Sequence, residues 1–160
     1  MAISFGNVEN IDELELPKDF NAVWANNLFE HLLAPHAFLM KLKTAVNDNA
    51  LLILGVPVIP KISTLLKVKK FRGSLSSAHI NFFTRESLRL TAERAGWKIV
   101  AVRPFIFTSK LLDFFASFIA PHLYVVAKND SKFIYPPKKV NEWEGDEHYA
   151  KLLKIGGVKK

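Results

Sequence analysis

The residues best suited to chemistry in this sequence are histidines that lie close to the ends of apolar segments. Glu30 and His31 are adjacent and follow the short apolar segment FNAVWA at residues 20–25. His79 lies between a second apolar segment and a later helical pattern. A neutral imidazole can accept a proton near pH 7, so His31 and His79 are candidate general bases. A structural hydrogen bond is the alternative role for each of them.

The other reactive residue types exclude several kinds of site. The chain has no cysteine, which excludes disulfides, a thiolate nucleophile and a cysteine zinc site, and which fits a reducing cytoplasm. His36, His122 and His148 share no i, i+4 helical face with an acid, so we expect no metal site. Glu30 itself fits the first turn of a helix, where the helix dipole favours an acid.

Positive charge is concentrated in one stretch of the chain. The 160 residues carry a net charge of +7, and residues 61–72 hold five basic side chains and no acid. If this stretch is a short helix, it could form a lid over a substrate. Lys67, Lys69, Lys70 and Arg72 are then candidate contacts for an anionic small-molecule acceptor. A membrane surface or an ordinary solvated face would also suit this charge.

Composition predicts one compact domain. Hydrophobic residues make up 49% and charged residues 23% of the chain, as in ordinary globular proteins. The longest apolar run, at residues 50–60, is shorter than the roughly 20 residues that span a bilayer. The chain start has no basic region followed by an apolar one, so we expect no secretory signal.

Strand patterns alternate with amphipathic helical patterns, which indicates an α/β fold with a largely parallel sheet. The residues at 50–56 are apolar in succession, which predicts a strand buried on both faces and ended by Pro57 and Pro60. The expected strands are 2–5, 20–25, 50–56, 97–102 with an extension to 105–107, and 122–127; the expected helices start at Pro35, Arg85 and Ser109. Ligands of such sheets bind beyond the carboxyl ends of the strands.

Two of the helices have clear end signals. Thr84 is a good N-cap and Gly96 a good C′ residue for a helix over 85–95. Ser109 can cap a helix whose residues 111–119 are apolar on nearly all sides. That second helix is most simply a core element, and a substrate channel or a subunit contact are the alternatives. The segment 129–160 is polar, and we expect one short helix in it, at 147–154.

Four blocks of the chain resemble class I S-adenosylmethionine-dependent methyltransferases. They are FNAVWANNLFEHLLAPHAFL, NALLILGVPVIP, AHINFFTRESLRLTAERAGWKIV and LYVVAKN, which are similar to that family's fourth strand, fifth strand, following helix and closing antiparallel strand. The resemblance implies a truncated Rossmann-like methyltransferase fold, mostly parallel with one antiparallel strand. It divides the chain into a partial methyltransferase domain at 1–128 and a polar C-terminal extension at 129–160.

The resemblance also implies S-adenosylmethionine as cofactor and places three residues near it. Asn7 and Val8 correspond to the positions beside the adenine ring, and Asn26 to the position facing the methionine end; a turn at Gly6-Asn7 and a helix cap at Asn26 are the alternatives. The family's glycine-rich cofactor loop is missing, because only Gly156 and Gly157 of the seven glycines are close together. The chain therefore resembles a methyltransferase without its first two strands.

Three functions remain open at this stage. The first is methyl transfer to a small-molecule acceptor, with a chain that is inactive by itself as the alternative, because the glycine-rich S-adenosylmethionine loop is missing. The second is a non-catalytic interaction module, or an inactive remnant, that forms a homo-oligomer through the sheet edge that the missing strands leave exposed. The third, a nucleic-acid-binding domain, fits less well because Phe71 is almost the only aromatic residue among the basic side chains.

Overall fold

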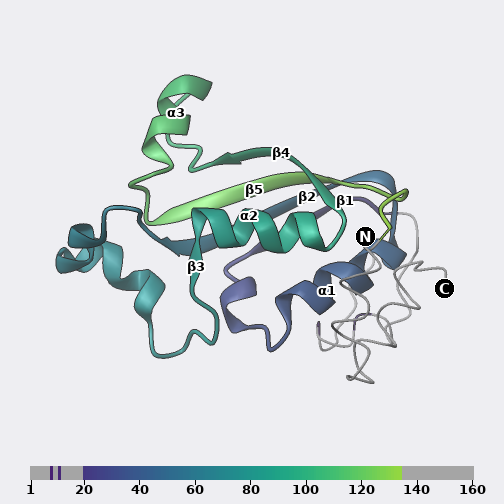
Figure 1. Ribbon diagram of the computed structural model, residues 1–160, viewed down its shortest axis with the longest axis horizontal. Helices are drawn as coiled ribbons and strands as arrows, with labels where there is room; N and C mark the ends of the chain where they lie inside the picture. Colours follow the sequence, from purple (N-terminus) through teal and green to yellow (C-terminus); the bar gives the residue numbers. More distant parts are fainter. Residues whose placement is uncertain (1–7, 9–10, 12–19, 135–160) are drawn as a thin grey trace, which may run out of the picture.

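The computed structural model describes residues 8, 11 and 20–134, and these form a five-stranded sheet with helices on one face (Figure 1). The main path of the sheet runs β1 (Phe20–Asn26), β2 (Val46–Ile59), β5 (His122–Asn129), β4 (Trp97–Arg103), and the short β3 (Phe83–Thr84) pairs with the end of β2. β1 and β2 are parallel, whereas β5 is antiparallel to both β2 and β4. The α/β class, the parallel pair and the single antiparallel strand are thereby confirmed.

Two helices cover the sheet and a third stands away from it. In Figure 1, α1 (Pro35–Leu42) and α2 (Arg85–Arg94) lie side by side on one face, and α3 (Lys110–Ala116) projects beyond the far side of β4. Short 3-10 segments join these elements: η2 (Phe29–His31), η3 (Lys43–Ala45), η4 (Ser63–Lys67) and η5 (Lys69–Leu75). In the described part of the chain, no helix is long and apolar enough to cross a membrane.

The core lies between the sheet and the α1–α2 pair. Leu52, Leu54 and Val56 of β2 have no exposed surface, and they pack in one cluster with apolar side chains of both helices. The indole N–H of Trp97 donates to the Leu39 carbonyl at 3.0 Å, which ties β4 to α1. Aromatic and aliphatic burial of this kind contributes roughly 1.5–3 kcal/mol per side chain.

The expectation that β2 is buried on both faces is wrong. Its burial alternates, and Leu51, Ile53 and Pro57 are only half-buried. The reason is that α1 and α2 both cover the face that carries Leu52, Leu54 and Val56, and neither covers the face that carries Leu51 and Ile53. β2 is also longer than expected, because it starts at Val46 and continues through Pro57 to Ile59.

Pro57 is tolerated inside β2 because of its place beside β1. The Val58 N–H donates to the Pro121 carbonyl on the β5 side, so the missing N–H of Pro57 would have faced the β1 side. β1 ends at Asn26, whose partner is Gly55, and there is no β1 carbonyl left for residue 57 to bond. The proline therefore costs the ladder no hydrogen bond.

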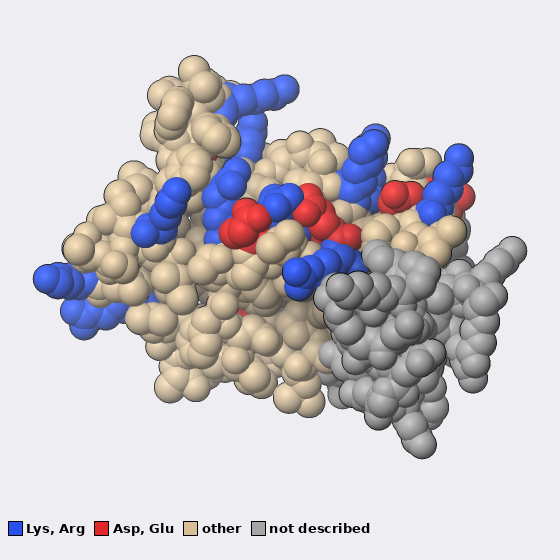
Figure 2. Space-filling model, viewed as in Figure 1, with Lys and Arg blue, Asp and Glu red and all other residues tan. Residues whose placement is uncertain are grey.

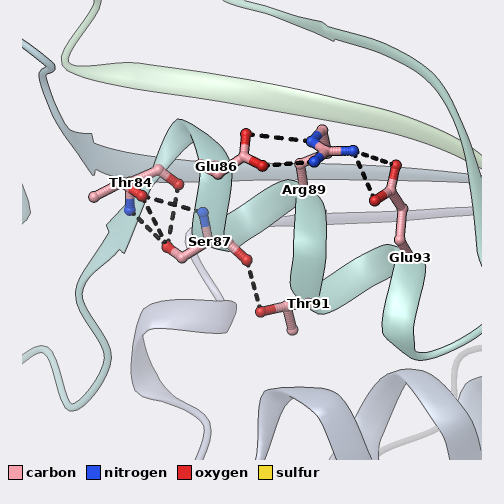
Figure 3. Close-up of polar contacts among 6 residues, drawn as sticks. All are labelled: Thr84, Glu86, Ser87, Arg89, Thr91 and Glu93. Carbon is pink, nitrogen blue, oxygen red and sulfur yellow. Dashed lines mark hydrogen bonds and ion pairs between the residues drawn. The ribbon is translucent and has the colours of Figure 1, made fainter.

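The predicted ends of α2 are confirmed, and Figure 3 shows the N-terminal one. The Thr84 hydroxyl accepts from the Ser87 N–H, and the Ser87 hydroxyl accepts from the Thr84 N–H, which completes a capping box. Gly96 follows the helix with a φ of 80°. On the solvent side, the Arg89 guanidinium bonds both Glu86 and Glu93.

The helix predicted at 109–119 forms as α3, but it is not a core element. Leu111 is 64% exposed and Phe115 is 61% exposed. The Ser109 side chain makes no cap hydrogen bond; instead the Asp113 carboxylate accepts from the backbone N–H groups of Ile106 and Phe107 at 3.0 and 2.9 Å. An apolar helix pattern indicates only that the side chains are apolar, not that another element covers them.

Other expectations fall on the edges of the described region. β4 ends at Arg103, so the extension to 105–107 is wrong; Phe105 adopts a φ of 56°, which breaks an extended strand. The expected strand at 2–5 and helix at 147–154 lie outside the described residues. The boundary at 128 stays a prediction, and β5 itself runs one residue past it to Asn129.

Candidate functional site

The carboxyl end of β1 carries polar side chains directly above the neighbouring strand. Asn26 pairs with Gly55, and a Cβ built on Gly55 would lie 2.1 Å from Asn26 Oδ1 and 2.5 Å from Tyr124 Cε1. Glycine at this position therefore lets the Asn26 amide and the Tyr124 ring cross the strand. Asn27 follows with a φ of 50°, and its side-chain Oδ1 lies within hydrogen-bond distance of His122 Nε2, at 3.1 Å.

Three residues with titratable side chains converge immediately after this turn. A carboxylate oxygen of Glu30 and one ring nitrogen each of His31 and His79 all lie within 4.8 Å of one another. The two imidazole rings meet edge to face with their centroids 5.0 Å apart. Glu30 is 1% exposed, whereas His31 is exposed and His79 half-buried, so the cluster has a buried acid and an open outer side.

Long-range hydrogen bonds hold the two halves of this cluster together. The N–H groups of Ile80 and Asn81 both donate to the Glu30 carbonyl, at 2.8 and 3.0 Å. The Asn81 side-chain amide donates to the carbonyls of Phe29 and Leu32. The segment before β3 is thus fixed against η2, and the cluster geometry is set by backbone contacts on both sides.

Hydrogen bonds also define the state of the two imidazoles. His31 Nδ1 lies 3.0 Å from the Ala78 carbonyl, and His79 Nδ1 lies 3.4 Å from the Ser74 carbonyl. A carbonyl can only accept, so each Nδ1 carries a proton and donates it. In the neutral rings, each Nε2 then keeps a free lone pair that can accept a proton or bind an ion.

A half-buried histidine stands beside the cluster on β5. Burial lowers the pKa of His122, and the negative charge of Glu30 partly opposes that shift. Its ring lies 4.9 Å from that of Tyr124, which in turn contacts Trp24 and Phe105. A cavity of about 410 Å³ on this uncovered face is lined by Trp24, Ile53, Pro104, Phe105, Tyr124 and Val126.

The basic stretch forms two 3-10 segments, η4 and η5, rather than one amphipathic helix. In Figure 2 the charged side chains at this end of the molecule are Lys and Arg, whereas acidic and basic side chains alternate over α2. Lys67, Lys69 and Lys70 are exposed, and no ion pair within the described residues involves them. Arg72 donates to the carbonyls of Leu66 and Lys67 at 3.1 and 2.9 Å, so its guanidinium joins the two segments.

A larger cavity of about 550 Å³ opens between the end of β2, the start of α2 and the end of α3. Its lining includes Lys61 and Arg85, and it includes none of the four basic residues singled out above. Arg85 donates through Nε to Ser117 Oγ at 3.0 Å and lies 5.2 Å from the Phe118 ring centroid. Single basic residues next to a helix N-cap are easy to overlook in a sequence, because only folding brings them to a cavity.

The remaining predicted site residues are less informative. Asn7 lies outside the described residues. Val8 is half-buried and packs against the core cluster. Asn26 is the last residue of β1, and Glu30, expected as a first-turn acid, lies buried beside His31 and His79. A search for i, i+4 spacing could not find the cluster, because His79 comes from a different segment.

The strand order and the direction of β5 define a Rossmann-like α/β protein. The family model described as a methyltransferase domain matches residues 2–102. The chain therefore belongs to the methyltransferase domain family. No curated protein matches the chain significantly in sequence.

Solved structures agree on the fold. An S-adenosylmethionine-dependent methyltransferase from Archaeoglobus fulgidus superposes with a TM-score of 0.56 and 13% identity, covering 78% of this chain and 66% of that one. A methyltransferase from Thermotoga maritima, described as a possible histamine N-methyltransferase, superposes with a TM-score of 0.52 and 15% identity. The match covers 78% of this chain and 62% of that one. A [4+2]-cyclase superposes with a TM-score of 0.53 and 11% identity, covering 79% of this chain and 54% of that one.

These likenesses establish fold and not chemistry. The chain spans about two thirds or less of the length of the three structures, and identity below one sixth does not transfer a substrate. The cyclase among them illustrates that one fold carries different reactions.

Proposed function

We propose that the protein acts in transfer of a methyl group from S-adenosylmethionine to a small-molecule acceptor at the carboxyl ends of β1 and β2. The observation that carries this proposal is the Glu30–His31–His79 cluster at that end of a methyltransferase fold. When bound, the cofactor supplies an electrophilic methyl group. The chain's own contribution is to orient the acceptor and to take its proton, and positioning alone provides much of the rate in such reactions.

The described residues fit one end of the cofactor. Asn26, held over Gly55, presents a side-chain amide beside an aromatic face, which suits a zwitterionic amino-acid group. A glycine-rich cradle for the nucleoside is not found: Gly55, Gly73 and Gly96, the glycines in the described part, lie far apart in sequence. The residues that would hold the nucleoside therefore stay undefined in this chain.

On the acceptor side, His31 or His79 serves as the base. With Nδ1 donating to a carbonyl, Nε2 of either ring can accept the proton of an acceptor hydroxyl or amine. Lys61 and Arg85 line the cavity at the same end of the sheet and would attract an anionic acceptor. The segments η4 and η5 would add positive electrostatic potential at the carboxyl end of β2, from Lys67, Lys69, Lys70 and Arg72.

Calorimetric titration of the full chain with S-adenosylmethionine tests the proposal. We expect binding in the micromolar range, weakened about tenfold by Asn26→Ala, which removes a hydrogen-bonding amide. Asn21→Ala, at the opposite end of β1, is the matched control and leaves affinity unchanged. Absence of binding by the full chain would overturn the proposal.

A second candidate function, a non-catalytic interaction module, is favoured by the uncovered face of the sheet. Trp24 is 68% exposed and Val100 is 58% exposed, and within the described residues β1 pairs with β2 alone. Exposed apolar faces and unpaired strand edges promote self-association, and the occupant would be a second copy of this chain. Light scattering would show a dimer that Trp24→Glu dissociates; a monomer at high concentration would reject this alternative.

A further inference from the structure

The polar cluster after β1 contains a buried acid with an unsatisfied oxygen. Glu30 is 1% exposed, and its Oε2 has no hydrogen-bond partner in the structure. Burying a carboxylate oxygen without a partner costs several kcal/mol, so native proteins rarely leave one in this state. A cation bound at this oxygen would remove that cost.

Two potential nitrogen ligands lie near this carboxylate. The ring nitrogens of His31 and His79 lie within 4.8 Å of each other and of the Glu30 carboxylate. Ligands about 2.1 Å from a tetrahedral ion lie roughly 3.4 Å apart, so ligand atoms within 4.8 Å of one another need to approach by at most about 1.4 Å. His31 is exposed, and such a movement requires only small side-chain rotations.

The surrounding backbone supplies the support that metal-binding histidines usually have. Each Nδ1 donates to a carbonyl, of Ala78 for His31 and of Ser74 for His79. This pattern fixes the tautomer and leaves Nε2 of each ring with a lone pair for an ion. The backbone of Glu30 is held as well, because the Ile80 and Asn81 N–H groups donate to its main-chain carbonyl.

We propose that Glu30, His31 and His79 form a binding site for one divalent transition-metal ion of the zinc class. Two imidazoles and one carboxylate suit zinc and its first-row neighbours, whereas magnesium prefers an all-oxygen set. Three protein ligands leave a fourth position, and the exposed side of His31 places that position toward solvent.

The open position has a consequence that rests on the proposed function. An acceptor hydroxyl bound to the ion would lose its proton to solvent more readily, because a bound divalent ion lowers the pKa of its oxygen ligand. Activation of the acceptor then passes from a free imidazole to the ion. The acceptor class that fits this site is an alcohol or phenol with an oxygen that can bind the metal.

The site is tested by titrating the full, metal-stripped chain with Zn²⁺ and counting bound ions by calorimetry and elemental analysis. We expect one tight site per chain. Glu30→Gln, His31→Ala and His79→Ala should each weaken it at least about 10- to 100-fold, because removal of an outer-shell partner alone causes a loss of that size. His36→Ala, a histidine outside the cluster, is the matched control and should leave affinity unchanged.

Folding does not confuse the result, because His31 is exposed and its removal leaves the core intact. Unchanged Zn²⁺ affinity in His31→Ala and His79→Ala would overturn the site, as would no Zn²⁺ binding or equal affinity for Mg²⁺. Binding of Zn²⁺ is measured without S-adenosylmethionine. Failure of the methyl-transfer proposal and failure of the metal site are therefore separate outcomes.

Discussion

Glu30 and Asp113 are both acids with almost no exposed surface, 1% and 0%, yet their surroundings differ. Asp113 accepts two backbone N–H groups through Oδ1, and its Oδ2 lies 3.4 Å from Arg103 Nε, a distance that makes an ion pair and not a hydrogen bond. Glu30 has no such cation, and the imidazoles of His31 and His79 stand beside it instead.

The difference fits a structural role for Asp113 and the proposed metal-binding role for Glu30. Asp113 connects the loop before α3 to β4. Glu30 has an oxygen without a hydrogen-bond partner, which is the oxygen that the proposed site would use, and proteins tolerate such groups mainly where function requires them. The two carboxylates should therefore respond in opposite ways to substitution.

The largest effect is expected at Asp113. Asp113→Ala leaves the Ile106 and Phe107 N–H groups without an acceptor and Arg103, which is half-buried, without its counter-charge. We expect a loss of about 3–5 kcal/mol in the free energy of unfolding, measured by urea denaturation. A loss below about 1 kcal/mol would show that Asp113 is not the structural acid of the pair.

Thr84→Ala provides an internal standard of known size. It removes the capping box at the start of α2 and touches neither carboxylate. The expected loss is about 1 kcal/mol in the same urea experiment. A much larger loss would show that one local change destabilises the whole fold. The effects of the two acids could then not be compared by single substitutions.

Glu30→Gln should behave differently from both. The neutral amide avoids the cost of a buried charge, so without metal the stability should be unchanged or rise by up to about 1 kcal/mol. Added Zn²⁺ should raise the melting temperature of the wild-type chain, because a ligand that binds only the folded state stabilises it, and should not raise that of the variant. Scanning calorimetry with and without the ion measures both; a large loss of stability without metal would make Glu30 a second structural acid.

The smallest effect concerns a partly buried cation. Burial lowers the pKa of Lys43 to about 8, against the opposing charges of Asp130 and Asp48, while Nζ donates to the Gly96 and Asp130 carbonyls. The unfolded chain holds this proton up to about pH 10.4, so stability attributable to Lys43 rises between pH 8 and that value and falls as pH drops through 8.

Comparison with Lys43→Met isolates this contribution. The wild-type chain should gain more unfolding free energy than the variant between pH 7.5 and pH 9.5. Because the side chain is partly exposed to solvent, this extra gain should be a few tenths of a kcal/mol to about 1 kcal/mol. Urea denaturation of both chains at pH 7.5 and pH 9.5 measures it. A wild-type chain that loses stability relative to the variant over this range would reverse the sign.

The sequence predicts those parts of the fold that depend on local patterns. Thr84 and Gly96 mark the ends of α2 because cap chemistry is local. The parallel pairing of β1 with β2 also follows, because short apolar strands separated by a helix favour it. By contrast, the exposure of α3 depends on which elements lie near it, and periodicity does not carry that information.

The site was predictable only residue by residue. His31 and His79 are recognisable because imidazole is the usual base near pH 7. Their convergence with Glu30 depends on the Asn81 and Ile80 hydrogen bonds, which join distant segments. Burial decides the role of Glu30, and burial is a property of the folded chain.

The uneven cover of the sheet also equips the molecule with an optical reporter. Trp24 stands on the open face with 68% of its surface exposed, whereas Trp97 is sealed beneath α1 with 1% exposed. After Trp143→Phe, emission at long wavelength would come from the open face and emission at short wavelength from the core. Anything that settles on β1, whether another polypeptide or a small molecule, should shift the first signal to the blue and leave the second in place.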